Sequence, residues 1–281
     1  MKKIVFLIAA LLLVLACASS KAVVDTEEEK SDLTVAKETL KETLTVKGVS
    51  FNMVTIPSGD FLMGSLSNEP DSFDNEHPQH RVSISAFQMG ETEVTQGLWK
   101  AVMGNNPSYF SECGDGCPVE QVSWNDVQIF IEKLNQIVPD GGFRLPTEAE
   151  WEYGCRAGTT TPFSFGKCLS TDQANYDGQN PLTGCAKGEF RKGLVPVAGF
   201  SPNAWGLYDM HGNVWEWCQD AYSGNAYRKH KSSNPVTMGE GPHRVYRGGG
   251  WRSYAKTCRS AIRSGYPSSD SYRYLGFRLS R

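Results

Sequence analysis

Glycine and proline interrupt this chain so often that short elements are favoured over long helices. The sequence holds 28 Gly and 14 Pro among 281 residues, and both residue types end regular elements or mark turns. Because 40% of the residues are hydrophobic, the chain still has enough apolar side chains for one sizeable core. The sequence therefore predicts a single irregular domain rich in turns.

The charge balance disfavours one class of partner. The formal net charge is −3, so the chain has no broad positive surface of the kind that binds nucleic acid. The arginines near the C-terminus are interleaved with aromatic residues and form no continuous basic block. We expect no nucleic-acid partner.

The N-terminus predicts export. Two lysines at positions 2 and 3 precede an apolar run over residues 4–15, which has the length of a secretory signal and is too short to span a membrane. We assign residues 1–16 as the signal peptide.

A lipid anchor is predicted directly after this signal. The motif Val14-Leu15-Ala16-Cys17 resembles a bacterial lipobox, in which the cysteine sulfur is lipidated before cleavage. Each buried methylene of an acyl chain contributes about 0.8 kcal/mol, so several chains on Cys17 would attach the protein to a membrane. Plain secretion is the alternative. Because no Asp follows Cys17, we expect the outer membrane, with display at the cell surface.

Residues 17–48 are predicted to be a flexible tether. From position 18 to 47 there is no aromatic residue, and charged and small polar residues dominate. Such a segment buries too little apolar surface to offset its ordering entropy. A short amphipathic helix through Leu33, Leu40 and Leu44 is the alternative.

Residues 49–281 are predicted to form one α+β domain. Apolar or alternating runs predict strands over 51–57, 59–64 and 81–87. A short helix is expected over 95–103, and two main amphipathic helices begin after the capping residues Ser123 and Thr147. Beyond residue 159 the sequence indicates mostly turns and irregular structure.

Seven motifs occur in order along the predicted domain. They begin at Glu91, Pro118, Phe143, Gly206, Gly212, Arg247 and Gly276, and read ETEVT, PVEQVSW, FRLPTEAEWE, GLYDM, GNVWEW, RGG and GFR. Together they resemble the formylglycine-generating-enzyme (sulfatase-modifying factor) domain family, and the resemblance extends over residues 49–281. It implies a C-type-lectin fold, which does not by itself settle function.

The same resemblance argues against the enzymatic activity of the family. Family oxidases bind Cu(I), a soft ion that prefers thiolates, through two cysteines five positions apart. The matching positions in this chain are Ser253 and Cys258. Because a hydroxyl does not replace a thiolate for Cu(I), we predict no oxidase activity and no required cofactor. A formylglycine-generating oxidase acting on sulfatase cysteines is the alternative.

The cysteine count predicts disulfides with at least one thiol left over. Without Cys17, seven of the 8 cysteines remain, an odd number for an oxidising compartment. Many pairings are open to this sequence. The pairing hypothesis joins Cys113 to Cys117, Cys168 to Cys185 and Cys218 to Cys258, and leaves Cys155 as a buried thiol.

A structural calcium ion is implied by the family resemblance. Asp209 and Glu216 would supply carboxylates, and Gly212 and Val214 would supply backbone carbonyls, a donor set that suits Ca²⁺. The alternative is that both carboxylates only hydrogen-bond the turn. The resemblance also suggests a second site at Asn175, Tyr176 and Glu189. His77 and His80 lack further clustered ligands, so we interpret them as exposed loop residues rather than a zinc site.

The segment within residues 247–278 has the composition of a recognition surface. Tyrosine supplies large contact area at low entropy cost, while serine and glycine supply small adaptable contacts. An ordinary polar loop is the alternative. The segment resembles the variable region of diversity-generating-retroelement proteins, in which adenine-directed changes yield residues encoded by NNC codons. Thirteen positions fit that set: Arg252, Ser253, Tyr254, Thr257, Ile262, Ser264, Gly265, Tyr266, Ser268, Ser269, Ser271, Tyr272 and Tyr274.

Residues with a constant character alternate with these thirteen and are expected to face the core. They are Trp251, Cys258, Arg259, Arg263, Leu275, Phe277 and Arg278. The sequence thus favours a surface lipoprotein that binds a protein or glycan ligand in adhesion or host contact. The oxidase named above and a structural envelope lipoprotein are the alternatives.

Overall fold

The computed structural model describes residues 40–239 and 241–281. The predicted signal peptide, Cys17 and the first part of the predicted tether lie outside the described residues. Within the described ranges, no helix combines the length and the apolar character needed to cross a membrane.

The first sheet is antiparallel and has the order β1-β2-β5. Its strands are β1 (Lys41–Val46), β2 (Val49–Ile56) and β5 (Phe87–Gly90). The predicted tether over 17–48 is therefore wrong in its last residues, since residues 41–46 pair along their whole length with β2. The physical reason is a period-2 alternation, which places Leu44 and Val46 on one face of β1, against the core.

A second sheet consists of β3 (Gly59–Met63) and β4 (His80–Ile84), paired antiparallel. The strands predicted over 51–57 and 59–64 are confirmed as β2 and β3. The strand predicted over 81–87 is divided, because β4 ends at Ile84 while Phe87 begins β5 in the other sheet.

All three predicted helices are present: α1 (Gln96–Met103), α2 (Trp124–Ile137) and α3 (Glu148–Arg156). The hydroxyls of Thr95, Ser123 and Thr147 accept hydrogen bonds from first-turn backbone N–H groups, as N-caps do. Helix α1 ends at Gly104, whose φ of 84° is in the left-handed region. The four short 3-10 turns are η1 (Asp74–Glu76), η2 (Ser111–Cys113), η3 (Ala226–Arg228) and η4 (Ala255–Thr257).

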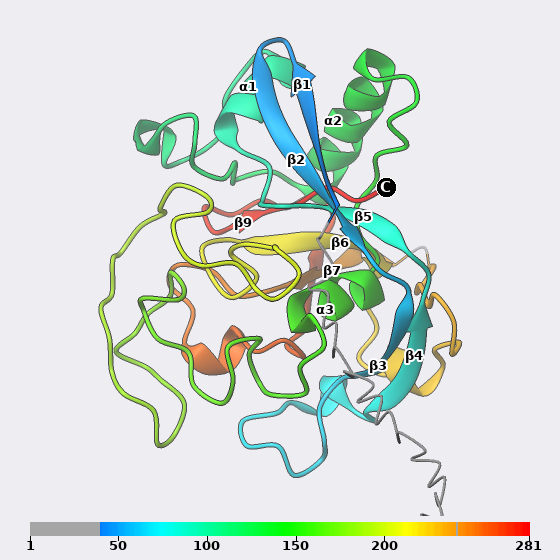
Figure 1. The fold of residues 1–281 in the computed structure, drawn as a ribbon, viewed down its shortest axis with the longest axis vertical. Coiled ribbons are helices and arrows are strands. Elements are labelled where there is room, and N and C mark those ends of the chain that lie inside the picture. Colours follow the sequence, from blue (N-terminus) through cyan, green and yellow to red (C-terminus); the bar gives the residue numbers. More distant parts are fainter. Residues whose placement is uncertain (1–39, 240) are drawn as a thin grey trace, which may run out of the picture. The chain divides into compact units, whose positions relative to one another are not determined.

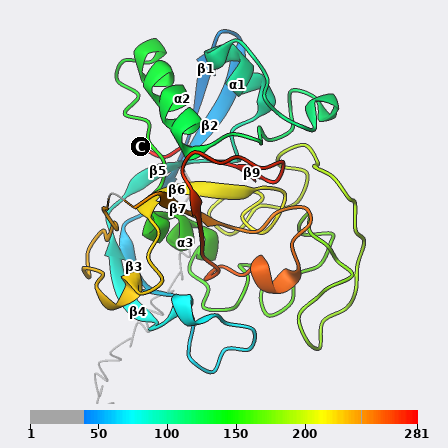
Figure 2. The same ribbon diagram turned by 180° about the vertical axis from the view of Figure 1, so that it is seen from behind.

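A four-stranded sheet of order β8-β7-β6-β9 lies at the centre of the domain (Figure 1). Helices α1 and α2 lie on one side of this sheet and α3 on the other (Figures 1 and 2). Residues 157–214 contain no helix or strand, in agreement with the irregular structure predicted there. The strands of the central sheet are β6 (Trp215–Ala221), β7 (His243–Arg247), β8 (Ser264–Pro267) and β9 (Leu275–Gly276).

Strand β6 separates the two main core clusters. Trp215 and Trp217 belong to the cluster that contains α1 and α2, whereas Cys218 belongs to the cluster that contains α3. This alternation follows from the two-residue period of a strand. The chain is thus an α+β domain whose central sheet is buried on both faces.

Candidate functional site

The predicted recognition segment wraps around the central sheet. After β7 the chain turns at Gly248 and Gly249, passes through η4 and returns as β8 beside β7. It then crosses to β9, on the opposite edge of the sheet, a path that Figure 2 follows from orange to red. Gly248 and Gly249 have φ values of 97° and 79°, and a Cβ on Gly249 would lie 2.5 Å from the Cys258 sulfur. Both glycines are therefore required by the turn.

Two buried arginines tie this segment to helix α3. Arg263 donates to both carboxylate oxygens of Glu148 at 2.6 and 2.8 Å. Arg247 pairs with Glu152 and lies 3.7 Å from Glu148. Burial alone would raise the pKa of Glu148, but the guanidinium groups of Arg263 and Arg247 outweigh it and lower this pKa to about 2. Glu148 is therefore ionised at any ordinary pH.

Two further buried arginines anchor the ends of the segment. Arg259 donates to Glu76 at 2.5 Å and so connects the end of η4 to η1. Arg278, which follows β9, donates to both oxygens of Glu216 at 2.6 and 2.7 Å. The inward placement predicted for the constant residues is confirmed, since all seven are at most 6% exposed.

Of the thirteen predicted contact positions, Ile262 is buried and Gly265 is half-buried but enclosed by Tyr222, and the other eleven reach the surface with their side chains. Arg252, Tyr254, Ser269 and Ser271 are exposed, and Tyr254 keeps 49% of its surface. The others are half-buried, so their side chains are held in place while part of each remains accessible. This half-buried set is Ser253, Thr257, Ser264, Tyr266, Ser268, Tyr272 and Tyr274.

The other two predicted positions, Ile262 and Gly265, belong to the scaffold. Ile262 is 4% exposed and lies within the core cluster beside α1 and α2. A Cβ on Gly265 would lie 2.1 Å from the Tyr222 ring. The prediction was wrong at these two positions because residue type alone does not distinguish an inward side chain from an outward one.

We expect Gly265→Ala to lower the free energy of unfolding by roughly 1–3 kcal/mol, because the added methyl overpacks the site against Tyr222. Urea denaturation measures this effect. Ser269→Ala, at an exposed position, serves as the control and is expected to change stability by less than about 0.5 kcal/mol. If the two variants were equally stable, Gly265 would have to be counted among the positions that can vary freely.

Three tyrosines form a contiguous row, which we call the tyrosine face: Tyr266, Tyr272 and Tyr274. Tyr266 and Tyr272 are hydrogen-bonded through their hydroxyls, with ring centroids 4.8 Å apart in an edge-to-face arrangement. Tyr272 and Tyr274 are stacked at 5.2 Å. One flank of the row packs on the core. The row is therefore a rigid aromatic surface, of the kind that contributes most at protein interfaces.

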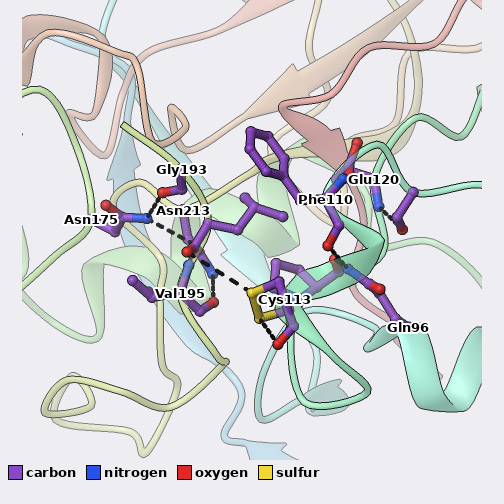
Figure 3. The surroundings of a disulfide bond; sticks show 12 residues. Gln96, Phe110, Cys113, Glu120, Asn175, Gly193, Val195 and Asn213 are labelled. Carbon is purple, nitrogen blue, oxygen red and sulfur yellow. Dashed lines mark hydrogen bonds between the residues drawn. A yellow bond between two sulfur atoms is a disulfide. The ribbon is translucent and has the colours of Figure 1, made fainter. Parts of the chain in front are cut away.

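The disulfide Cys113–Cys117 closes the loop that lies beside this segment. Figure 3 shows Gln96, Phe110 and Glu120 on one side of the disulfide and Asn175, Gly193, Val195 and Asn213 on the other. The Asn213 amide connects these last residues, since its oxygen accepts from Asn175 at 3.1 Å and from the Val195 N–H at 3.2 Å. The loop itself is linked to the residues that follow Val195, since the Val197 N–H donates to the Gly116 carbonyl at 2.9 Å.

Two of the three predicted disulfides are confirmed, Cys113–Cys117 and Cys168–Cys185. The third, Cys218–Cys258, is wrong: both thiols are free and buried. Cys218 lies in the core cluster next to α3, whereas Cys258 lies in a separate small cluster around Phe163 and Tyr176. Cys155 is the buried thiol that was expected.

These three thiols are expected to resist alkylation in the native protein. Burial raises the pKa of Cys155 to about 12 and raises the pKa of Cys218 and of Cys258, so little thiolate forms at mildly alkaline pH. Iodoacetamide treatment followed by peptide mapping tests this. Denaturant without reductant should expose all three thiols, while labelling of Cys258 in the native protein would contradict its placement.

The predicted calcium ligands do not fit together as a site. Glu216 is committed to Arg278 and also accepts from the Trp151 indole at 2.7 Å. One oxygen of Asp209 accepts from the Ala198 N–H at 2.7 Å, and only its other oxygen lacks a partner. Gly212 and Val214 could offer only backbone carbonyls, which are too few ligands for Ca²⁺ by themselves.

The other metal assignments gain no support either. In the described ranges no three His, Cys, Asp or Glu side chains are grouped to hold a metal ion. At the second suggested site, the Asn175 amide donates a hydrogen bond to the Gly193 carbonyl, and the Tyr176 hydroxyl donates one to the Leu169 carbonyl. Glu189 forms an ion pair with Arg191. His77 and His80 are half-buried rather than exposed, and His80 belongs to β4. The His77 ring is hydrogen-bonded to the Ser65 carbonyl, and His80 contacts His230, a neighbour that sequence spacing did not indicate.

The positions that match the copper ligands of the family differ in environment. The Ser253 hydroxyl is half-buried and accepts a hydrogen bond from the Gly250 N–H at 2.9 Å. Cys258 is completely buried. The structure therefore places a hydroxyl and an enclosed thiol at these two positions.

The model of the sulfatase-modifying factor enzyme 1-like domain matches residues 39–281. The chain belongs to this family. The matched range begins close to β1, which agrees with a domain that starts before residue 49.

Relatives within this family carry different names. The formylglycine-generating enzyme of Bos taurus is 31% identical over 286 residues, covering 80% of this chain and 73% of the relative. Treponema denticola variable protein 1 is similar in structure, with a TM-score of 0.68 and 29% identity over 86% of this chain and 98% of that one. PvdO from Pseudomonas aeruginosa gives a TM-score of 0.70 and 30% identity over 82% and 94%. The predicted family and fold class are confirmed, and membership alone leaves the activity open.

Proposed function

We propose that this protein is a lipid-anchored surface protein that binds a protein or glycan ligand through the segment between Arg247 and Arg278. The observation that carries the proposal is the contrast between a buried frame and accessible contact positions. Four buried arginine–glutamate pairs hold the frame, while eleven candidate side chains keep accessible surface. Side chains can then change at the surface without disturbing the scaffold.

A diversified binding surface is the best explanation for this arrangement. The similarity to Treponema denticola variable protein 1 supports it, as does the residue set at the candidate positions. Sequencing the gene and its flanking DNA from several isolates tests the proposal. A near-repeat that differs only at adenines is expected beside the gene, whereas fixed codons at these positions would favour a structural envelope lipoprotein.

Tolerance to substitution is a second test of the same surface. A library that randomises the eleven accessible positions should yield mostly folded, protease-resistant protein. A matched library at Ile262 and Gly265 should yield mostly unfolded protein, because both side-chain positions are enclosed. Similar losses in the two libraries would contradict the division into frame and surface.

An oxidase is the second candidate function, favoured by the 31% identity to the formylglycine-generating enzyme of Bos taurus. We consider it weaker because Ser253 and Cys258 offer only one thiol for Cu(I), which is also completely buried. Copper titration with a cysteine-containing peptide separates the two functions. No turnover is expected, and formation of an aldehyde on the peptide would establish the oxidase.

A further inference from the structure

Two arginines at the candidate surface differ from the four in the frame. Arg252 is exposed, and its guanidinium lies 5.8 Å from the centroid of the Tyr274 ring. The guanidinium of Arg273 lies 5.1 Å from the Tyr109 ring and 5.9 Å from the Trp251 ring. We call Arg252 and Arg273 the cationic corner. Both arginines are stacked on aromatic rings at the surface.

Neither arginine of the cationic corner forms an ion pair within the described residues. Glu120 is the one carboxylate whose pKa Arg273 lowers through its charge, and it is buried, which raises that pKa more strongly. Within the same described residues, neither guanidinium donates a hydrogen bond to another side chain or to a carbonyl. A guanidinium stacked on an aromatic ring keeps its N–H donors in the plane, where they remain available for a planar acceptor. Arg252 and Arg273 are therefore pre-positioned donors that lack an acceptor within the described residues.

The aromatic residues that contact Arg273 lie outside the thirteen candidate variable positions. Tyr109 is 59% exposed and precedes Cys113, the first cysteine of the Cys113–Cys117 disulfide. Its neighbour Phe110 packs edge-on against Trp251 at 5.5 Å, and the Phe110 N–H donates to Glu120 at 2.8 Å. The stacking partners of Arg273 thus come from the scaffold. This lowers the entropy that Arg273 would lose on binding.

The charge of the surface indicates the sign of the ligand. Between residues 251 and 274, the accessible charged side chains are Arg252, Lys256, Arg273 and Asp270, so positive charge prevails. The whole chain has a formal charge of −3. A segment with net positive charge on an acidic protein favours an acidic partner at that segment and discriminates against basic ones.

The shape of the surface indicates the class of the ligand. Four cavities of about 200, 300, 590 and 620 Å³ are lined by residues outside the thirteen candidate positions. Small ligands bind in concave sites, whereas accessible aromatic and arginine side chains are typical of protein interfaces. The combination favours a protein over a small saccharide.

Building on the proposed function, we infer that the tyrosine face and the cationic corner together receive an acidic patch on a protein partner. Carboxylates of the partner accept hydrogen bonds from Arg252 and Arg273, and its apolar side chains pack on Tyr266, Tyr272 and Tyr274. Since Arg252 is itself a candidate variable position, this preference belongs to the present sequence rather than to the fold.

The test uses a phage library of a small single-domain scaffold with randomised loops, selected against the immobilised full-length protein. Selected clones are measured against Arg252→Gln/Arg273→Gln and against Tyr272→Ala. Because Tyr272 is half-buried, Tyr254→Ser is included as a second variant at an exposed tyrosine. The matched charge control is Arg228→Gln/Lys229→Gln, which removes two exposed positive charges at η3.

We expect acidic loops among the clones and at least about tenfold weaker binding to the arginine double variant, with the control unchanged. Clones that need the tyrosines but bind the arginine double variant equally well would overturn the inference and leave the proposed function standing. Clones whose binding is weakened by neither the arginine nor the tyrosine substitutions would overturn both the inference and the proposed function. Heparin binding that depends on both arginines, without acidic clones, would replace the protein partner by a sulfated glycan.

Discussion

Glu148→Gln is expected to lower the free energy of unfolding by about 3–5 kcal/mol. The reason is that Arg263 and Arg247 are both buried and both rely on the carboxylates of α3 for charge compensation. Removing one partner of a buried ion pair leaves an uncompensated charge, which costs more than the pair itself contributes. Urea denaturation followed by circular dichroism gives the measurement.

Glu132→Gln on the exposed side of α2 is the matched control and should change stability by less than about 0.5 kcal/mol. If Glu148→Gln were as mild as this control, the arginines would not depend on Glu148. The frame would then be held mainly by apolar packing, and the segment between Arg247 and Arg278 would lose its proposed anchor.

The same carboxylate makes stability depend on pH. The folded pKa of Glu148 is about 2, below its ordinary value of 4.5. A lowered folded pKa means that the unfolded chain binds the proton first, so the stabilisation is complete above about pH 4.5 and is lost as the pH falls toward 2. As the pH is lowered, the free energy of unfolding should therefore fall less steeply in Glu148→Gln than in the wild type.

Local signals in the sequence predicted much of the fold. Each helix begins at a hydroxyl N-cap that the sequence displays, Thr95, Ser123 and Thr147. Those signals act within a few residues and need no tertiary context. Strand β1 was missed because residues 41–46 are polar apart from Leu44 and Val46, and become a strand only through pairing with β2. Tertiary pairing of this kind overrides local composition.

Composition singled out a segment in which most positions are accessible, and the errors within it share one cause. Which way each side chain points depends on neighbours distant in sequence. Gly265 is confined by Tyr222, and Arg273 gains its stacking partner from Tyr109. No pattern within the segment indicates either contact. The disulfide assigned to Cys218 failed likewise, because its burial in another cluster is a property of the fold.

Glu216→Gln is expected to cost about 3–5 kcal/mol of unfolding free energy, and the loss should be the same with calcium or with EDTA. Arg278 occupies both oxygens of Glu216, and the Trp151 indole shares one of them. The substitution therefore leaves Arg278 buried without its counter-charge. Thermal unfolding of the wild type and the variant, each with added Ca²⁺ and with EDTA, provides the comparison.

Asp209→Asn is the matched variant, since it alters the one predicted ligand that has an unpartnered carboxylate oxygen. Calcium that bound this loop would stabilise the wild type by mass action, and either substitution would abolish that gain. A rise in melting temperature with Ca²⁺ that both variants lose would show that Glu216 exchanges Arg278 for the metal. Because Arg278 ends the segment that carries the tyrosine face, calcium would then control the position of the binding surface, whereas a calcium-independent result leaves that position to the arginine pairs.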